Sequence, residues 1–412
     1  MSSHRTSHCR ICAAPIAPFM SFGRMPIANG FLTEAQTADE YFFELAPAFC
    51  DRCGMFQLVE QPDPARMFHG QYAFYSSTSR HMQMHFEAFA RTVMDDVLAD
   101  RADPFVVELG SNDGIMLRHF QRRGIRHLGV EPSVNVADEA RAQGIRTVSA
   151  FFDPGLAAGI AAEDGQADAI LAANVMCHIA DLPGVAEGVR TLLRPGGVFM
   201  FEDPYLGDMI SKTAYDQIYD EHVFIFSVHS ISYAFARHEL ELVDVLPQAT
   251  HGGSMRYVVS HKGVREPTPR VAEQLAKERA LGLDDPASYL QFKRNCERSR
   301  AALMQVLREL RGRGRRIVGY GATSKSTTVT NYCGITTDHL EFISDTTPIK
   351  QGKLSPGAHI PVRPHSEFVR RYPDFALLFA WNHATEIRER ETAFVAAGGR
   401  WISYVPEVAI SS

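Results

Sequence analysis

The chain has 412 residues, which is enough for two or three domains with sizeable cores. Hydrophobic residues make up 45% and charged residues 22%, the balance of a soluble globular protein, and no apolar run is long enough to span a bilayer. The formal net charge of −6 argues against a protein that lives on nucleic acid, whose binding face is usually basic. The N-terminus lacks the apolar core of a signal peptide, so we expect a cytoplasmic protein without a membrane partner.

Two C-x-x-C pairs stand near the N-terminus and involve four of the seven cysteines: Cys9, Cys12, Cys50 and Cys53. One such pair could be a redox pair. Two of them in a reducing compartment favour a tetrahedral zinc site over disulfides, because each pair can hold one ion across a tight turn. Gly54 suits the backbone bend of such a turn. With protein thiolates at all four positions, the predicted zinc is structural and not catalytic.

Strands and helices alternate after residue 71, which predicts a central domain over residues 71–250 behind a zinc-binding domain over residues 1–70. The helical spacing of apolar residues predicts a helix over 80–100. The expected strands are 105–109, 126–131, 146–149 and 167–174, and the expected helices between them are 115–123 and 133–143. This alternation is typical of an α/β domain with a parallel, doubly wound, Rossmann-like sheet.

A first glycine loop follows the strand at 105–109. Its glycines allow close approach of a ligand, and an acidic residue at the end of the next strand can accept two ribose hydroxyls. The loop lacks G-x-G-x-x-G, and its carboxylates would repel a pyrophosphate. A cationic ligand with a ribose, S-adenosylmethionine, fits better. The candidate residues for this cofactor are Glu108, Gly110, Asn112, Asp113, Gly114 and Glu131.

Two further candidates for the methionine or adenine side of this cofactor lie at the end of the strand at 167–174. They are Asn174 and His178, although His178 can equally be a hydrogen-bonded helix histidine. The Leu-Arg-Pro-Gly-Gly run at 193–197 resembles the turn between the fourth and fifth strands of class I methyltransferases.

The run from 202 to 222 combines acidic, aromatic and imidazole side chains just after a buried strand. Parallel sheets present their chemistry at this carboxyl edge. Tyr219, Glu221 and His222 are close enough in sequence to line one cleft, where they can supply a general base and the groups that hold it. The alternative is a surface loop whose aromatic residues only pack.

A second α/β unit is predicted over residues 315–412, after a helical connector over 251–314. Its glycine loop places small residues and a lysine at a helix start, which favours a phosphate or pyrophosphate. NAD or a nucleotide-linked substrate satisfies this pattern, and a Rossmann-like domain that binds nothing is the alternative. The candidate substrate-binding residues here are Tyr320, Ser324, Lys325 and Asp345.

Six blocks in the same order as in a known family give the chain its strongest resemblance. They lie at 108–117, 202–208, 215–222, 251–256, 319–326 and 356–363. With the four-cysteine N-terminus, they resemble the sugar C-methyltransferases of deoxysugar biosynthesis, which methylate C3 of nucleotide-linked 4-keto-6-deoxyhexoses. The resemblance implies a class I S-adenosylmethionine methyltransferase domain between an N-terminal zinc-binding domain and a second, C-terminal Rossmann-like domain that binds the nucleotide.

The resemblance also implies roles for particular residues. The catalytic base falls on His222, with Tyr219 and Glu221 beside it, and Arg256 falls in a substrate-binding block. A tyrosine-rich segment at 71–77 resembles a family segment that reaches the sugar, through Tyr72 or Tyr75.

Other functions are compatible with parts of the pattern. They are a methyltransferase acting on RNA or protein, an NAD-dependent sugar-nucleotide oxidoreductase, a non-catalytic sugar-nucleotide scaffold, and an additional epimerase activity at a carbon beside the ketone. The sequence does not determine whether the nucleotide is dTDP or GDP, nor the substituents and stereochemistry of the sugar. It also leaves the oligomeric state open, and a monomer is compatible with it.

Overall fold

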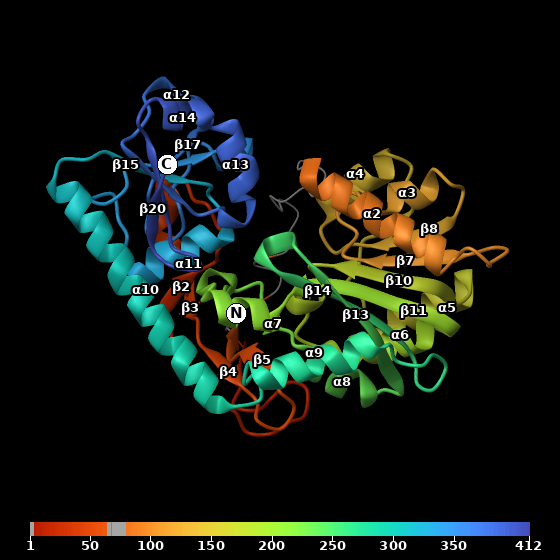
Figure 1. Ribbon diagram of the computed structural model, residues 1–412. Coiled ribbons are helices and arrows are strands. Elements are labelled where there is room, and N and C mark those ends of the chain that lie inside the picture. The colour runs from red at the N-terminus through yellow and green to blue at the C-terminus, as the bar shows by residue number, and fades with distance from the viewer. Residues whose placement is uncertain (1–3, 64–66, 68–79) are drawn as a thin grey trace.

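A computed structural model describes residues 4–63, 67 and 80–412 of the chain. It contains two large, mostly parallel sheets, one in the middle of the sequence and one at the C-terminal end (Figure 1). The N-terminal strands pack against residues from both halves. Within the described ranges, no helix is both long enough and apolar enough to cross a membrane.

The N-terminal unit is built from short strands in small antiparallel ladders. β4 (Pro47–Phe49) pairs with β5 (Phe56–Leu58), and β5 also pairs with β12 (Phe224–Ile225). Because β12 follows directly after the run at 215–222, the N-terminal unit and the central domain share one three-stranded sheet. The other elements of this unit are β1 (His4–Arg5), β2 (Arg24–Pro26), η1 (Glu34–Asp39), β3 (Phe42–Glu44) and β6 (Glu60–Gln61).

The central sheet has seven strands in the order β13-β14-β11-β10-β7-β8-β9. The strands β9, β8, β7, β10 and β11 are parallel to one another, and β14 is antiparallel to both of its neighbours. The strands are β7 (Phe105–Leu109), β8 (Arg126–Val130), β9 (Thr147–Val148), β10 (Ala167–Ala173), β11 (Leu193–Pro204), β13 (Leu240–Gln248) and β14 (Ser254–His261). The predicted doubly wound α/β sheet is confirmed.

Helices cover both faces of this sheet (Figure 1). They are α2 (Arg80–Asp96), α3 (Leu117–Gln121), α4 (Val134–Ala142), α5 (Pro154–Asp164), α6 (Leu182–Leu192) and α8 (Val228–Ala236). The helix α7 (Leu206–Lys212) follows β11 and packs with residues of the C-terminal domain. Short 3-10 turns stand at η3 (Met176–His178), η4 (Tyr215–Gln217) and η5 (Thr250–Gly252).

The central sheet continues past residue 250, where the sequence pattern places the start of a connector. β14 forms a hairpin with β13 and lies between β13 and β11 in the sheet. A short apolar run does not reveal by itself whether it joins the preceding sheet, because that depends on partners elsewhere in the chain. The connector therefore begins only after His261.

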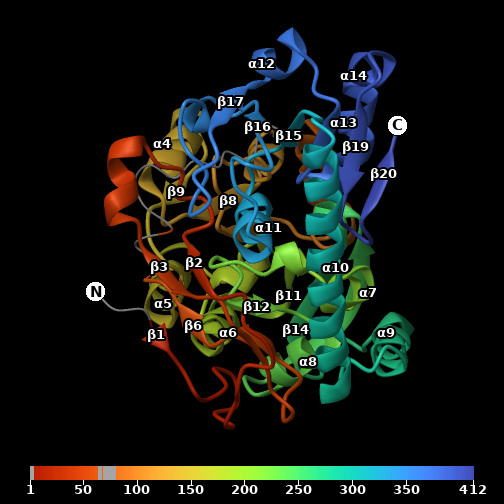
Figure 2. The same cartoon turned by 90° about the vertical axis from the view of Figure 1, so that its left-hand side faces the viewer.

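The predicted connector consists of two helices, α9 (Pro269–Ala280) and α10 (Pro286–Gly312). Both begin with proline at the first helical position, where its missing N–H costs no hydrogen bond. Figure 2 shows α10 running along the molecule beside elements from all three parts.

The C-terminal sheet has six strands in the order β17-β16-β15-β18-β19-β20, all parallel except β20. Its strands are β15 (Ile317–Tyr320), β16 (Ile343–Asp345), β17 (Val362–Pro364), β18 (Phe375–Leu378), β19 (Arg400–Ser403) and β20 (Ala409–Ser411). Its helical elements are α11 (Ser324–Cys333), η6 (Pro348–Lys350), α12 (His365–Arg370), η7 (Trp381–His383), α13 (Ala384–Arg390) and α14 (Thr392–Ala396).

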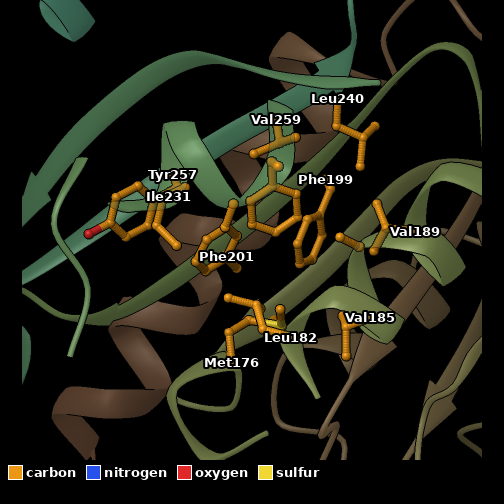
Figure 3. Close-up of a cluster of buried hydrophobic side chains, with 14 of the residues drawn as sticks. Met176, Leu182, Val185, Val189, Phe199, Phe201, Ile231, Leu240, Tyr257 and Val259 are labelled. Atoms are coloured by element: carbon orange, nitrogen blue, oxygen red, sulfur yellow. The ribbon is translucent and has the colours of Figure 1, made fainter. Parts of the chain in front are cut away.

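The core of the central domain fixes the strand that leads into the run at 202–222. Alternate residues of β11 face opposite sides of the sheet, since side chains along a strand alternate. Phe199 and Phe201 pack toward α6 and α8 (Figure 3), whereas Val198 and Met200 belong to the cluster on the other face. This buried strand holds the following acidic residues at the carboxyl edge of the sheet.

Candidate functional site

The four cysteines of the two C-x-x-C pairs come together in the N-terminal unit. Their sulfur atoms all lie within 4.8 Å of one another, with 3.5 Å between Cys9 and Cys53 and 3.5 Å between Cys12 and Cys50. Sulfurs around one tetrahedral zinc ion are about 3.8 Å apart, because each Zn–S bond is about 2.3 Å long. All four side chains are buried. The set therefore fits the structural zinc that the spacing predicts.

Neighbouring groups favour a thiolate at Cys9. The Ile11 N–H lies 3.4 Å from the Cys9 sulfur, and the Gln57 amide donates to it at 3.1 Å. Such outer donors orient metal ligands and stabilise their charge. Gly54 has the positive φ of 68° that its position after the second pair suggests. The zinc site thus has a second layer of support.

Three carboxylates from the first glycine loop and the next strand gather at the edge of the central sheet. Glu108, Asp113 and Glu131 are all buried. Burial, followed by the charges of Asp113 and Glu131, raises the pKa of Glu108 well above its usual range. A pyrophosphate would increase this repulsion, whereas a ligand with positive charge relieves it. The residues therefore fit S-adenosylmethionine, which carries a sulfonium and an ammonium.

Glu131 is held by the backbone of the same loop. Its two oxygens accept hydrogen bonds from the Asn112 N–H at 3.0 Å and the Ser133 N–H at 2.7 Å. Each carboxylate oxygen has a further lone pair, so Glu131 can still accept the hydroxyls of a ribose.

The glycines of this loop are required by the backbone and by neighbouring side chains. Gly110 and Gly114 have φ of 63° and 77°, in the left-handed region that favours glycine. A Cβ on Gly110 would lie 2.3 Å from Val175, and one on Gly114 would lie 2.2 Å from Ile145. Asn174 also has a positive φ of 57°, and its N–H donates to the Glu202 carbonyl at 2.7 Å. The loops at this edge are therefore fixed closely against one another.

We expect Gly110→Val to weaken S-adenosylmethionine binding at least tenfold while sugar-nucleotide binding is retained, because the two glycine loops belong to different sheets. Gly124→Val is the matched control, since Gly124 has the same kind of positive φ but no atom within 4 Å of its Cβ position. Asp113→Ala, which removes one carboxylate without a clash, should also weaken the methyl donor. Isothermal calorimetry with each ligand measures both effects. Loss of sugar-nucleotide binding alone would reverse the assignment.

His222 is a buried imidazole with a defined tautomer. Its Nδ1 lies 2.6 Å from the Gln217 carbonyl, which can only accept, so Nδ1 carries the proton. Its Nε2 therefore accepts a hydrogen bond from the Tyr219 hydroxyl at 2.7 Å. Burial, with His178 nearby, holds the pKa of His222 well below its usual range. At neutral pH His222 is thus a neutral base whose Nε2 carries no proton.

The structure places His178 against His222. The two rings are stacked with centroids 5.4 Å apart, and burial lowers the pKa of His178 to about 4. His178 is therefore neutral at neutral pH and offers no negative charge that would stabilise a protonated His222. The expectation that His178 contacts the methyl donor remains a prediction, and its position beside the base is the new observation.

Cys177 joins the two histidines within 4.8 Å, a grouping that can resemble a metal site. Both nitrogens of His222 already have hydrogen-bond partners. Burial also raises the pKa of the Cys177 thiol well above its usual range. A role for His222 as a base stays a prediction.

Arg256 is engaged by the protein itself. Its guanidinium donates to the same oxygen of Glu202 from Nε at 3.0 Å and from Nη2 at 2.8 Å, and it lies 3.6 Å from the centre of the Phe89 ring. His85 pairs with the other oxygen of Glu202. The pairing follows from register, because Glu202 on β11 lies opposite Arg256 on β14. Its predicted role in substrate binding stays a prediction.

The side chain of Tyr320, within the second glycine loop, packs into the core of the C-terminal domain. Its hydroxyl lies 2.6 Å from Glu391 and 2.7 Å from Arg390, and its ring packs edge-on against Trp401. Asp345 supports the loop, since its oxygens accept from the N–H groups of Ala322 and Thr347, both at 2.7 Å.

Lys325 lies at the junction with the central domain. Its ammonium donates to Asn382 at 3.1 Å and to the His251 carbonyl at 3.4 Å, and it lies 4.8 Å from the centre of a Trp381 ring. Burial lowers the pKa of Lys325 to about 8. Ser324, half-buried, begins the same helix α11. Tyr72 and Tyr75 lie outside the described residues.

Asp216 is a site residue that sequence reasoning did not select. Its Oδ2 accepts from the Trp381 indole at 2.6 Å and from the Tyr404 hydroxyl at 2.7 Å. The C-terminal domain thus holds the residue next to Gln217, whose carbonyl fixes the His222 tautomer. The available signal was a carboxylate inside a run of apolar and aromatic residues, which implies buried partners.

Comparisons with known proteins agree with this arrangement. Family models match a zinc binding domain at residues 9–68, a methyltransferase domain at 80–245 and a C-methyltransferase C-terminal domain at 249–406. The C-methyltransferase NovU of Streptomyces niveus is 34% identical over 407 residues, covering 98% of this chain and 96% of that protein.

Two solved structures resemble part of the chain. One is a SAM-dependent methyltransferase from Anabaena variabilis, with 17% identity and a TM-score of 0.35, covering 43% of this chain and 84% of that one. The other is an S-adenosylmethionine-dependent methyltransferase from Clostridium acetobutylicum, with 13% identity and a TM-score of 0.33, covering 45% and 94%.

Proposed function

The chain belongs to the C-methyltransferase family, and on that premise we propose that it methylates C3 of a nucleotide-linked 4-keto-6-deoxyhexose. As a member of this family it is an S-adenosylmethionine-dependent enzyme with a class I methyltransferase domain and a structural zinc site. The observation that carries the proposal is His222, a buried and neutral imidazole with an unprotonated Nε2.

The proposed reaction needs a base because an ordinary C–H bond does not attack a sulfonium. A C3–H beside a C4 ketone is acidified, since its electron pair can delocalise onto the C4 oxygen. The C3–H bond breaks, the proton passes to Nε2 of His222, and negative charge develops at that oxygen. S-adenosylmethionine supplies the methyl group when bound. The new C3–C bond then forms as the S–C bond breaks, with its electron pair left on sulfur.

The charge at the C4 oxygen needs a hydrogen-bond donor, and the Tyr219 hydroxyl is the candidate. Without the sugar it donates to Nε2 of His222 at 2.7 Å, and turning to the C4 oxygen would free that nitrogen to accept the C3 proton. For the diphosphate, Lys325 and Ser324 at the start of α11 are the candidates, because a helix N-terminus and an ammonium both favour phosphate.

We expect labelled methyl transfer from S-adenosylmethionine to at least one 4-keto-6-deoxysugar in a panel of dTDP- and GDP-linked substrates. Mass spectrometry should show a gain of one methyl group, and NMR should place it at C3. The matched 4-hydroxy sugars serve as the control and should not react, because they cannot delocalise the electron pair. Methylation at oxygen or nitrogen, or none across the panel, would refute the proposed substrate.

The same panel tests the rival activities. Deuterium incorporation with inversion and no methyl gain would indicate an epimerase, and a change in nicotinamide absorbance would indicate an oxidoreductase.

A further inference from the structure

A turn of the N-terminal unit is inserted between the run at 215–222 and helix α11 of the C-terminal domain. The Ala28 N–H donates to Oδ1 of Asp220 at 3.0 Å, and the Ala28 carbonyl accepts from the Thr327 hydroxyl at 2.8 Å. Within the turn, the Phe31 N–H donates to the Asn29 carbonyl at 2.9 Å. The backbone at this point is therefore bonded to both of the other domains.

The next residue in this turn, Asn29, contacts the candidate catalytic group directly. Its side-chain amide donates to Oε1 of Glu221 at 2.8 Å, across 192 positions of sequence. Glu221 is only 4% exposed, so this hydrogen bond is shielded from water. A hydrogen bond to a buried carboxylate both fixes its direction and stabilises its charge.

Several charged groups face Glu221 from the elements packed around it. Asp220 precedes it in the chain, and the Cys177 thiol is near enough to be affected by its charge. The Lys350 ammonium comes from the C-terminal domain, where it donates to the Ala322 carbonyl at 2.8 Å and lies 4.8 Å from the centre of the Phe31 ring. Burial raises the pKa of Glu221, and the Asn29 hydrogen bond and the Lys350 charge oppose that rise.

We propose that Asn29 is a positioning residue that fixes the carboxylate of Glu221, the residue before His222 in the chain, so that the zinc-binding unit completes the active site. The inference rests on the proposed function and assigns a role in the reaction to a domain whose zinc is structural. The unit delivers this contact because its strand β5 is paired with β12, two residues after His222. The N-terminal unit thus contacts the run at 215–225 at two places, through the shared sheet and through Asn29.

Asn29→Ala should lower kcat for methyl transfer roughly ten- to a hundredfold, the range for losing a hydrogen bond to a charged group. The acidic limb of the pH–rate profile should move to higher pH, since an unsupported Glu221 binds its proton more readily. Zinc content and the dissociation constant for S-adenosylmethionine should stay unchanged. Asn29→Gln should restore part of the rate because it keeps the donor. Asn331→Ala, which removes an amide that bonds only Thr327 and Pro356 in the residues described, is the matched control.

A double-mutant cycle separates positioning from general stability. In a Glu221→Gln background, Asn29→Ala should have little further effect, because the carboxylate it supports is already gone. If the Asn29 loss persists in full in that background, or if Asn29→Ala keeps the native rate and pH profile, the inference is wrong. Should Asn29→Ala lose zinc, Asn29→Leu, which is similar in size and has no donor, replaces it in the same cycle.

A measurement without sugar distinguishes this inference from the proposed function. Carbon-13 NMR of glutamate-labelled protein, with Glu221→Gln assigning the signal, follows the titration of the Glu221 carboxyl. A higher midpoint in Asn29→Ala supports the contact even if every 4-ketosugar fails as a substrate. An unchanged midpoint in an enzyme that does methylate such sugars refutes the positioning role and leaves the proposed function standing.

Discussion

His222→Ala is expected to lower the rate of methyl transfer by roughly a factor of a hundred to ten thousand, the usual contribution of a general base. The structure gives the reason: Nδ1 is committed to the Gln217 carbonyl, and Nε2 is the unprotonated nitrogen beside Tyr219. Single-turnover kinetics with S-adenosylmethionine and the ketosugar measure the loss. Both ligands should still bind with native affinity, since neither depends on the base.

Exchange of the C3 proton with solvent gives an independent test of the same role. If the native enzyme exchanges it for deuterium without the methyl donor, His222→Ala should abolish this exchange. Tyr219→Phe should be milder, because it removes one hydrogen bond and leaves the base. A native rate in His222→Ala would end the assignment, and the base would be sought in Glu221 or in Tyr72 and Tyr75.

The pH dependence follows from the same environment. Because the pKa of His222 is held well below 6.5, the base stays unprotonated as the pH falls through 6.5, and the rate limb that it controls should lie below that value. A rate that halves near pH 6.5 in the native enzyme would contradict a buried His222 as the group that controls this limb.

Loss of the zinc ion is expected to unfold the N-terminal unit and to abolish activity. A structural zinc contributes about 10–16 kcal/mol of apparent binding free energy in small zinc domains, and this is folding free energy. The four cysteines belong to the same buried cluster as Met55 and Phe224. Loss of zinc should therefore also disrupt the packing of the sheet that β5 shares with β12. Cys50→Ser should therefore lose zinc in elemental analysis and methyl transfer together.

Cys296→Ser is the matched control for this prediction. Cys296 is also fully buried, but it lies on α10 outside the cysteine cluster, so its substitution should leave one zinc per chain. An active, folded Cys50→Ser protein, or native protein without zinc, would show that the cluster does not have the structural role assigned to it.

Local patterns in the sequence predicted most of the helices and strands, the cysteine cluster and the carboxylates of the first glycine loop. The doubled C-x-x-C spacing predicts the cysteine cluster, because one zinc ion takes four thiolates and each pair supplies two of them. The alternation of strands and helices predicts a doubly wound sheet, because each element follows from a local pattern of residues. The carboxylates Glu108, Asp113 and Glu131 also follow from local position, since parallel strands end at one edge. Tyr219 and His222 are three residues apart, so one turn suffices to join them.

Tertiary structure alone decided which distant groups meet. The membership of β14 in the central sheet, the ion pair of Arg256 with Glu202, the stacking of His178 on His222 and the inward direction of Tyr320 all depend on strand register and on which face packs. Asn29 meets Glu221 across 192 positions because β5 pairs with β12 and the turn at 27–31 is bonded from both sides. Such contacts are set by the packing of whole faces, which no spacing within one segment records.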